Sequence, residues 1–126
     1  MAFEWSTNDI ASMVITLYPT NITLNKSACR HFEGVKYVML GIDREAHQLA
    51  IKPVPKKDID SGMYPADQLH HISIGKSYGR VTSKAFLSRL ATLIPVDFDT
   101  LPCVKIRATY DVVHGLLIAD YKEVCH

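Results

Sequence analysis

A strand-to-helix pattern occurs twice in this chain, and a repeated supersecondary unit restricts the possible folds more than any other feature of the sequence. When the chain is moved along itself so that Lys26 falls on Lys84, the two stretches carry similar residue types at similar positions. The matched positions are Val14 with Ile72, Thr16 with Ile74, Thr23 with Val81, Asn25 with Ser83, Cys29 with Leu87 and Phe32 with Leu90. Few residues are identical, so the repeat is one of pattern and stands as a hypothesis.

The first copy covers about residues 14–54. Asn25 suits a helix N-cap because its side-chain oxygen can accept a hydrogen bond from the free amides of the next turn. Gly34 is a suitable left-handed residue to end that helix. The residue pattern predicts strands at 14–18 and 22–24, a helix at 26–32, and hairpin strands at 36–42 and 48–52 joined by a polar turn at 43–47.

The second copy covers about residues 72–121, and Ser83 takes the N-cap position in it. Apolar residues recur at helical spacing just after Ser83, which makes residues 84–93 the clearest helix of the sequence. Strands are predicted at 71–74 and 80–82 before this helix, and at 103–110 and 116–121 after it. Residues 55–71 between the copies contain Pro55, Gly62 and Pro65, so we expect a linker or long surface loop there.

Composition is that of an ordinary soluble domain. The 126 residues are 48% hydrophobic and 21% charged, which predicts one compact domain over residues 1–126 with two halves sharing a core. No apolar run is long enough to cross a bilayer, and the acidic N-terminal stretch argues against a signal peptide. The three cysteines form no CxxC pair; we expect Cys29 and Cys103 to be packed thiols, Cys125 to lie at a frayed end, and the protein to be cytoplasmic.

The phrases that begin the helix and end the hairpin resemble those of the AbrB family of transition-state regulators. Residues 22–26 (ITLNK) and 51–53 (IKP) stand where that family has its strand-to-helix phrase and its hairpin-closing phrase. Residues 79–84 (GRVTSK) resemble a phrase of the MraZ relatives, which carry two such units in one chain. The resemblance implies a β-rich α+β fold, in which duplicated strand–strand–helix–hairpin units form a swapped-hairpin-like barrel. It also implies a DNA-binding regulator or antitoxin-like module, commonly an oligomer.

Cations fall at or near matching places in the two copies. The formal net charge is only +1, so any nucleic-acid site depends on how these residues cluster on one face. The candidate nucleic-acid-binding residues are Lys26, Arg30, Lys76, Arg80, Lys84 and Arg89, with double-stranded DNA as the expected partner. Tyr78 would offer a flat contact beside them. Lys105 and Arg107 share one face of a predicted strand and are either a third contribution or the solvated side of the sheet.

Catalytic and metal-binding patterns are weak in this sequence. Residues 75–77 (GKS) end like a phosphate-binding loop, but the glycine required five places earlier is His70, which favours a simple turn. Cys29 and His31 are two apart on the predicted helix and point to different faces. The histidines have no HxxxH or HxH spacing. We therefore expect no enzyme activity, cofactor or metal, and the alternative to DNA binding is a protein–protein assembly module of the same fold.

Overall fold

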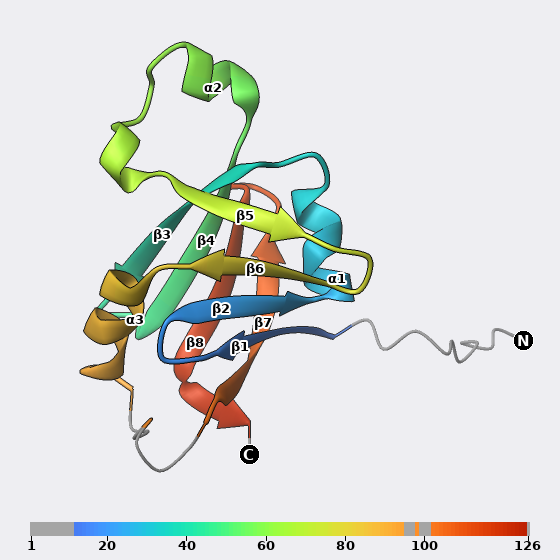
Figure 1. Cartoon of the computed structure of the whole chain (residues 1–126). Coiled ribbons are helices and arrows are strands. Elements are labelled where there is room, and N and C mark those ends of the chain that lie inside the picture. The colour runs from blue at the N-terminus through green and yellow to red at the C-terminus, as the bar shows by residue number, and fades with distance from the viewer. Residues whose placement is uncertain (1–11, 95–97, 99–101, 126) are drawn as a thin grey trace, which may run out of the picture.

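The computed structural model describes residues 12–94, 98 and 102–125, and its strands form a closed antiparallel β-barrel (Figure 1). Around the barrel the order is β1, β2, β6, β5, β3, β4, β8 and β7, and β7 pairs back with β1. The elements in chain order are β1 (Met13–Leu17), β2 (Asn21–Asn25), α1 (Lys26–Cys29), the 3₁₀ helix η1 (Arg30–Phe32), β3 (Tyr37–Asp43), β4 (Gln48–Val54), α2 (Lys56–Asp60), the 3₁₀ helix η2 (Ala66–Gln68), β5 (His70–Ile74), β6 (Tyr78–Thr82), α3 (Lys84–Ala91), β7 (Val104–Asp111) and β8 (Leu116–Cys125).

Alternating side chains point into the barrel and form one apolar core. In β7, Val104, Ile106 and Ala108 are buried while Lys105 and Arg107 are exposed, so the predicted alternation of this strand is confirmed. The helices add a second set of buried residues, which are Ala28, Cys29 and Phe32 from the first helical segment and Phe86, Leu87 and Leu90 from α3. Buried residues therefore recur every second position in the strands and at helical spacing in α3, and both sets belong to the same core.

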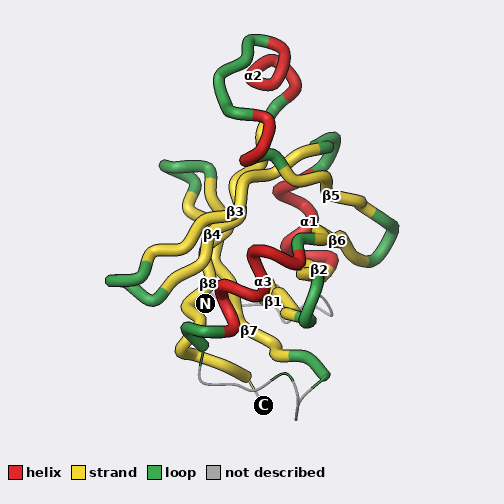
Figure 2. Tube along the Cα trace, turned by 60° about the vertical axis from the view of Figure 1, so that its left-hand side comes forward, coloured by secondary structure: helices red, strands yellow, loops and turns green. Residues whose placement is uncertain are grey.

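The segment between the halves contains more structure than the sequence indicated. Residues 55–71 were expected to be a linker or loop, but they include α2 and η2, and β5 already begins at His70. The region of α2 extends away from the barrel (Figures 1 and 2). Helices of three to five residues are too short to produce a hydrophobic period, and neither buries a residue, so no apolar pattern marked them.

The predicted match of Val14 with Ile72 does not agree with the burial of the strands, because Val14 is only half-buried whereas Ile15 and Ile72 are buried. Ile15 pairs with Leu24 across β1 and β2, and Ile72 pairs with Val81 across β5 and β6. Buried positions therefore match when Ile15, not Val14, is placed on Ile72. Ser83 separates β6 from α3, whereas Asn25 is both the last residue of β2 and the helix cap. A slip of one residue exchanges the two faces of a strand, which the sequence comparison could not detect.

Both predicted N-caps are confirmed. Oδ1 of Asn25 accepts a hydrogen bond from the Ala28 amide at 3.1 Å, and Oγ of Ser83 accepts one from the Phe86 amide at 3.3 Å. Asn25 does more than cap its helix. Its Oδ1 also accepts the Val14 amide at 3.1 Å, and its Nδ2 donates to the Ser12 carbonyl at 2.9 Å. Asn25 therefore ties the start of β1 to the start of α1.

Replacing the two caps by alanine should have unequal effects. Loss of an N-cap costs about 0.5–2 kcal/mol in general. We expect Asn25→Ala to lower the free energy of unfolding by about 2 kcal/mol, because three hydrogen bonds are lost, and Ser83→Ala by about 0.5–1 kcal/mol. Urea denaturation measures both. Asn25→Asp keeps the acceptor but loses the donor and should fall between them, and equal losses for the two alanine variants would contradict this account.

The two hairpins close with turns of the same kind. Asp43 begins the turn between β3 and β4, and Asp111 begins the turn between β7 and β8. The fifth residue of each turn has a positive φ, 59° at His47 and 66° at Gly115. In each turn the aspartate Oδ1 accepts two main-chain N–H groups, from Glu45 and Ala46 in the first and from Val113 and His114 in the second. The predicted polar connection at 43–47 is thus confirmed as a hairpin turn.

Candidate nucleic-acid interface

Among the residues that the structure describes, the strands of one side of the barrel wall carry no acidic residue. Residues 12–32 and 68–94 contain six lysines and arginines but no aspartate or glutamate. These residues form β1, β2, β6 and β5, which are consecutive around the barrel, together with α1, η1 and α3. In the described chain, the acids lie in the hairpin turns, around α2 and η2, after η1, and on β8. We call the outer side of β1, β2, β6 and β5 the basic wall.

Three of the candidate cations follow β6 from one end to the other. Lys76 lies in the turn before β6, Arg80 is in the middle of the strand, and Lys84 is the first residue of α3. All three side chains are exposed. Figure 1 shows α1 near the β5–β6 turn and α3 at the opposite end of β6. The strand itself spans about 13 Å at 3.3 Å per residue.

Lys26 lies at the same end of the barrel as Lys76. It follows Asn25 directly, and Asn25 is the partner of Tyr78 in the pairing of β2 with β6. The antiparallel register thus brings the start of α1 beside the start of β6. Sequence reasoning placed Lys26 and Lys84 at corresponding helix starts, and the structure puts these starts at opposite ends of β6.

Arg80 is held over an aromatic ring. Its guanidinium carbon lies 5.6 Å from the centre of the Tyr78 ring, and Tyr78 is 47% exposed. A cation over an aromatic face gains about 0.5–1 kcal/mol at exposed sites. This contact restricts the guanidinium while leaving its hydrogen-bond donors accessible, so Arg80 is oriented for a phosphate or a base edge.

The cationic surface continues across the neighbouring strand β7. Lys105 pairs with Thr16, Thr16 with Thr23, and Thr23 with Arg80, which places these residues in one row across four strands. At a strand spacing of about 4.8 Å, the Cα atoms of Lys105 and Arg80 lie roughly 14 Å apart along the wall. Lys105 and Arg107 both point outward and are exposed. Their shared strand face was visible in the sequence, but only the β1–β7 pairing joins them to the basic wall.

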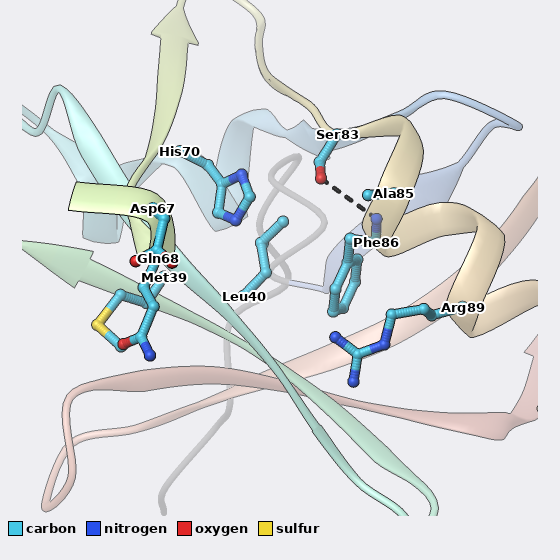
Figure 3. Close-up of a pocket in the computed structure, with 9 residues that line it drawn as sticks. All are labelled: Met39, Leu40, Asp67, Gln68, His70, Ser83, Ala85, Phe86 and Arg89. Atoms are coloured by element: carbon cyan, nitrogen blue, oxygen red, sulfur yellow. Dashed lines mark hydrogen bonds between the residues drawn. The ribbon is translucent and has the colours of Figure 1, made fainter. Parts of the chain in front are cut away.

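The remaining candidate cations have other surroundings. Arg30 is an exposed residue of η1 and has a contact of its own within the protein. Arg89 lies on α3 and lines a cavity with His70 and Phe86 (Figure 3). The structure therefore brings Lys26, Lys76, Arg80 and Lys84 to the basic wall, whereas Arg89 belongs to a different site.

Three ionisable groups outside the basic wall have shifted pKa values, and each shift has a physical cause in the structure. Cys29 is buried, its Sγ donates to the Leu24 carbonyl at 3.5 Å, and burial raises the pKa of the thiol, so the prediction of a packed cysteine is confirmed. Burial also lowers the pKa of His70. The hydrogen bond between the His114 imidazole and Asp111 Oδ2, at 2.7 Å, lowers the pKa of the Asp111 carboxyl.

The motif at residues 75–77 is a turn between β5 and β6. The Gly75 amide donates to the Tyr78 carbonyl at 2.8 Å and closes the hairpin. The predicted simple turn at residues 75–77 is thus confirmed. In the described part of the chain, no group of three or more His, Cys, Asp or Glu is arranged to hold a metal ion. Among the described helices, none combines the length and apolar character needed for a membrane span.

Comparison with known proteins adds no relative. No protein-family model matches the chain, and no curated protein or solved structure matches it significantly.

Proposed function

We propose that this protein is an internally duplicated barrel of the swapped-hairpin type and a cytoplasmic regulator that binds double-stranded DNA. The first part of the proposal concerns the fold. Exchange of β1, β2, β3 and β4 with β5, β6, β7 and β8 leaves the set of strand pairings unchanged. For example, the pair β1–β7 becomes β5–β3, and the pair β2–β6 becomes itself. This is the connectivity expected of two interlocked copies about an approximate twofold axis, as the AbrB-like resemblance implies.

Local features support the same duplication. Cys29 and Leu87 are both buried four residues after their N-caps, and Phe32 and Leu90 are both buried seven residues after them. The hairpin turns that begin at Asp43 and Asp111 share their hydrogen bonds and their left-handed fifth residue. Capped amphipathic helices and aspartate-initiated hairpin turns also occur in unrelated segments, so these features support the duplication only together with the strand pairings.

The basic wall carries the proposal for DNA. Lys76 lies in the turn before β6, Arg80 on β6, and Lys26 and Lys84 at helix starts. None of these segments contains an acidic residue, so no carboxylate within them neutralises the four cations. These four cations can contact phosphates, and the barrel fixes the spacing between the positions that carry them. Release of counterions from DNA would then supply most of the affinity. The Tyr78–Arg80 pair supplies the group best oriented for a specific contact.

A salt-dependent titration tests this function. Fluorescence anisotropy with a labelled mixed-sequence duplex should give an observed affinity that falls with a logarithmic slope of about −3 to −4 between about 50 and 200 mM salt, as expected for four phosphate contacts. The variant Lys26→Gln, Lys76→Gln, Arg80→Gln, Lys84→Gln should bind at least about tenfold more weakly, with the slope reduced by about one for each lost contact.

The control removes the same number of charges elsewhere. Arg44, Lys56, Lys57 and Lys122 are exposed and lie outside the basic wall, in the first hairpin turn, α2 and β8. Replacing all four by glutamine should leave the slope nearly unchanged, because this variant differs from the first only in where the charge is removed. Equal losses for the two variants, or no salt-dependent binding by the original protein, would reject the proposed interface.

Protein–protein assembly is the second candidate, and one observation favours it. Val112 and Val113, at the tip of the β7–β8 turn, are 83% and 88% exposed, whereas the corresponding residues of the other turn are Arg44 and Glu45. The turn conformation alone therefore does not require valines. A stable higher oligomer by light scattering, together with no DNA affinity in the titration above, would support this alternative.

A further inference from the structure

A cavity of about 440 Å³ lies between α3, β3, β5 and η2 (Figure 3). It arises from the strand pairing, since β3 pairs with β5 only through Tyr37 and Val38. β5 begins at His70, the partner of Val38, so Met39 and Leu40 have no partner on β5 and line the cavity together with residues of η2 and α3. The volume is within the range of pockets that hold small molecules, roughly 300–1,000 Å³.

The walls of this cavity combine apolar surface with a few polar groups. Leu40, Phe86 and Met39 form the apolar part. Figure 3 shows the Arg89 guanidinium below the Phe86 ring and the His70 imidazole on the opposite side of Leu40. Within the described residues, the side chains of Arg89, His70 and Gln68 have no hydrogen bond or ion pair. These three polar side chains are therefore available to a ligand, whereas the Ser83 hydroxyl already accepts the Phe86 amide.

We propose that this cavity binds a small organic monocarboxylate with an apolar chain, independently of any DNA binding. Arg89 holds the carboxylate, because a guanidinium matches the two carboxylate oxygens with two parallel N–H donors. Leu40 and Phe86 cover the apolar chain, and the removal of this chain from water supplies the rest of the affinity. His70, Gln68, Asp67 and the Ser83 hydroxyl are the other hydrogen-bonding groups at the described wall.

Among the described lining residues, Asp67 is the acidic one, and it restricts the ligand further. Asp67 lies on the side away from Arg89 (Figure 3). A second carboxylate at the far end of the ligand would meet this negative charge, whereas an apolar or hydrogen-bond-donating end would not. The arrangement therefore selects a monocarboxylate over a dicarboxylate of the same length.

Chemical-shift titration of the full chain tests this site with named probes. In ¹H–¹⁵N spectra, sodium octanoate should cause saturable shifts at residues 67–70 and 83–90. Octan-1-ol and disodium octanedioate should bind at least about tenfold more weakly, a difference of about 1.4 kcal/mol. Saturable binding of octanol as tight as that of octanoate, or shifts confined to other regions, would overturn the proposal.

Variants of α3 distinguish a direct contact between Arg89 and the carboxylate from a general effect of positive charge. Arg89→Gln should weaken octanoate binding at least about tenfold and leave octanol unaffected, a loss of the size expected for a charged hydrogen-bonded pair. Arg89→Lys should lose part of the affinity, because lysine keeps the charge but not the two parallel N–H donors. Lys84→Gln, on the same helix but not in the cavity wall, should bind octanoate normally. An Arg89→Gln variant that folds and binds octanoate as the original does would refute the assignment.

Discussion

Replacement of Phe32 by alanine should lower the free energy of unfolding by about 3–5 kcal/mol, the largest single effect we expect in this protein. Phe32 is fully buried in the core although it belongs to a 3₁₀ helix of only three residues. Such a short helix has little stability of its own, so the segment after α1 depends on this side chain for its position. The loss includes both the transfer of the ring to water and the cavity that remains.

Guanidinium denaturation followed by circular dichroism measures this loss, and the neighbouring residue supplies the control. His31 is exposed and stacks on Tyr110, with ring centroids 3.9 Å apart and planes 8° apart. An aromatic pair of this kind contributes about 0.5–1.5 kcal/mol, so His31→Ala should cost far less than Phe32→Ala. Similar losses for the two variants would mean that Phe32 is not a core residue.

Substitution of Gly79 by valine is expected to destabilise the barrel by about 1–3 kcal/mol through overpacking. Gly79 is buried in β6, facing α1. A Cβ atom at this position would lie 2.9 Å from Cδ1 of Ile74 and 3.0 Å from Sγ of Cys29. The Ile74 side chain is 39% exposed and can move outward, but Cys29 is buried in the core. The Cys29 sulfur atom is therefore the contact that opposes a larger side chain at position 79.

A double-mutant cycle measures that contact directly. Gly79→Ala should destabilise the protein less than Gly79→Val, because alanine adds only the Cβ atom. In the Cys29→Ala background the same Gly79→Ala change should cost measurably less, since the sulfur atom is gone and the new methyl group has room. Thermal or urea unfolding of the four proteins provides the comparison. Strict additivity of the two substitutions would contradict close packing between β6 and α1.

The sequence predicted those elements that are long enough to show a hydrophobic period or that begin with a recognisable cap. The helix after Ser83 was recognised because Phe86, Leu87 and Leu90 recur at helical spacing, and all three are buried. The first helix was expected to run through residues 26–32, but only residues 26–29 are α-helical and the rest is 3₁₀. Seven residues provide too few turns to distinguish the two conformations by pattern.

The candidate site was predictable only in part, for reasons that lie in the strand pairing. The sequence shows that residues 12–32 and 68–94 carry cations without acids. It does not show that these stretches form consecutive strands, or that β1 pairs with β7 and brings Lys105 into line with Arg80. Arg89 has the residue type of a phosphate contact but lines a cavity, because β5 begins only at His70 and leaves Met39 and Leu40 without a strand partner beside α3.

The amino-acid sequence by itself determined the caps at Asn25 and Ser83, the alternation of β7 and the amphipathic α3. Each of these depends on residues within a few positions of one another, where propensity and period act. Only the tertiary structure decided the order of strands around the barrel, the pairings of Ile15 with Leu24 and of Ile72 with Val81, and the cavity beside Arg89. Those features depend on which segments pair across the chain, and contacts between distant residues leave no local period in the sequence.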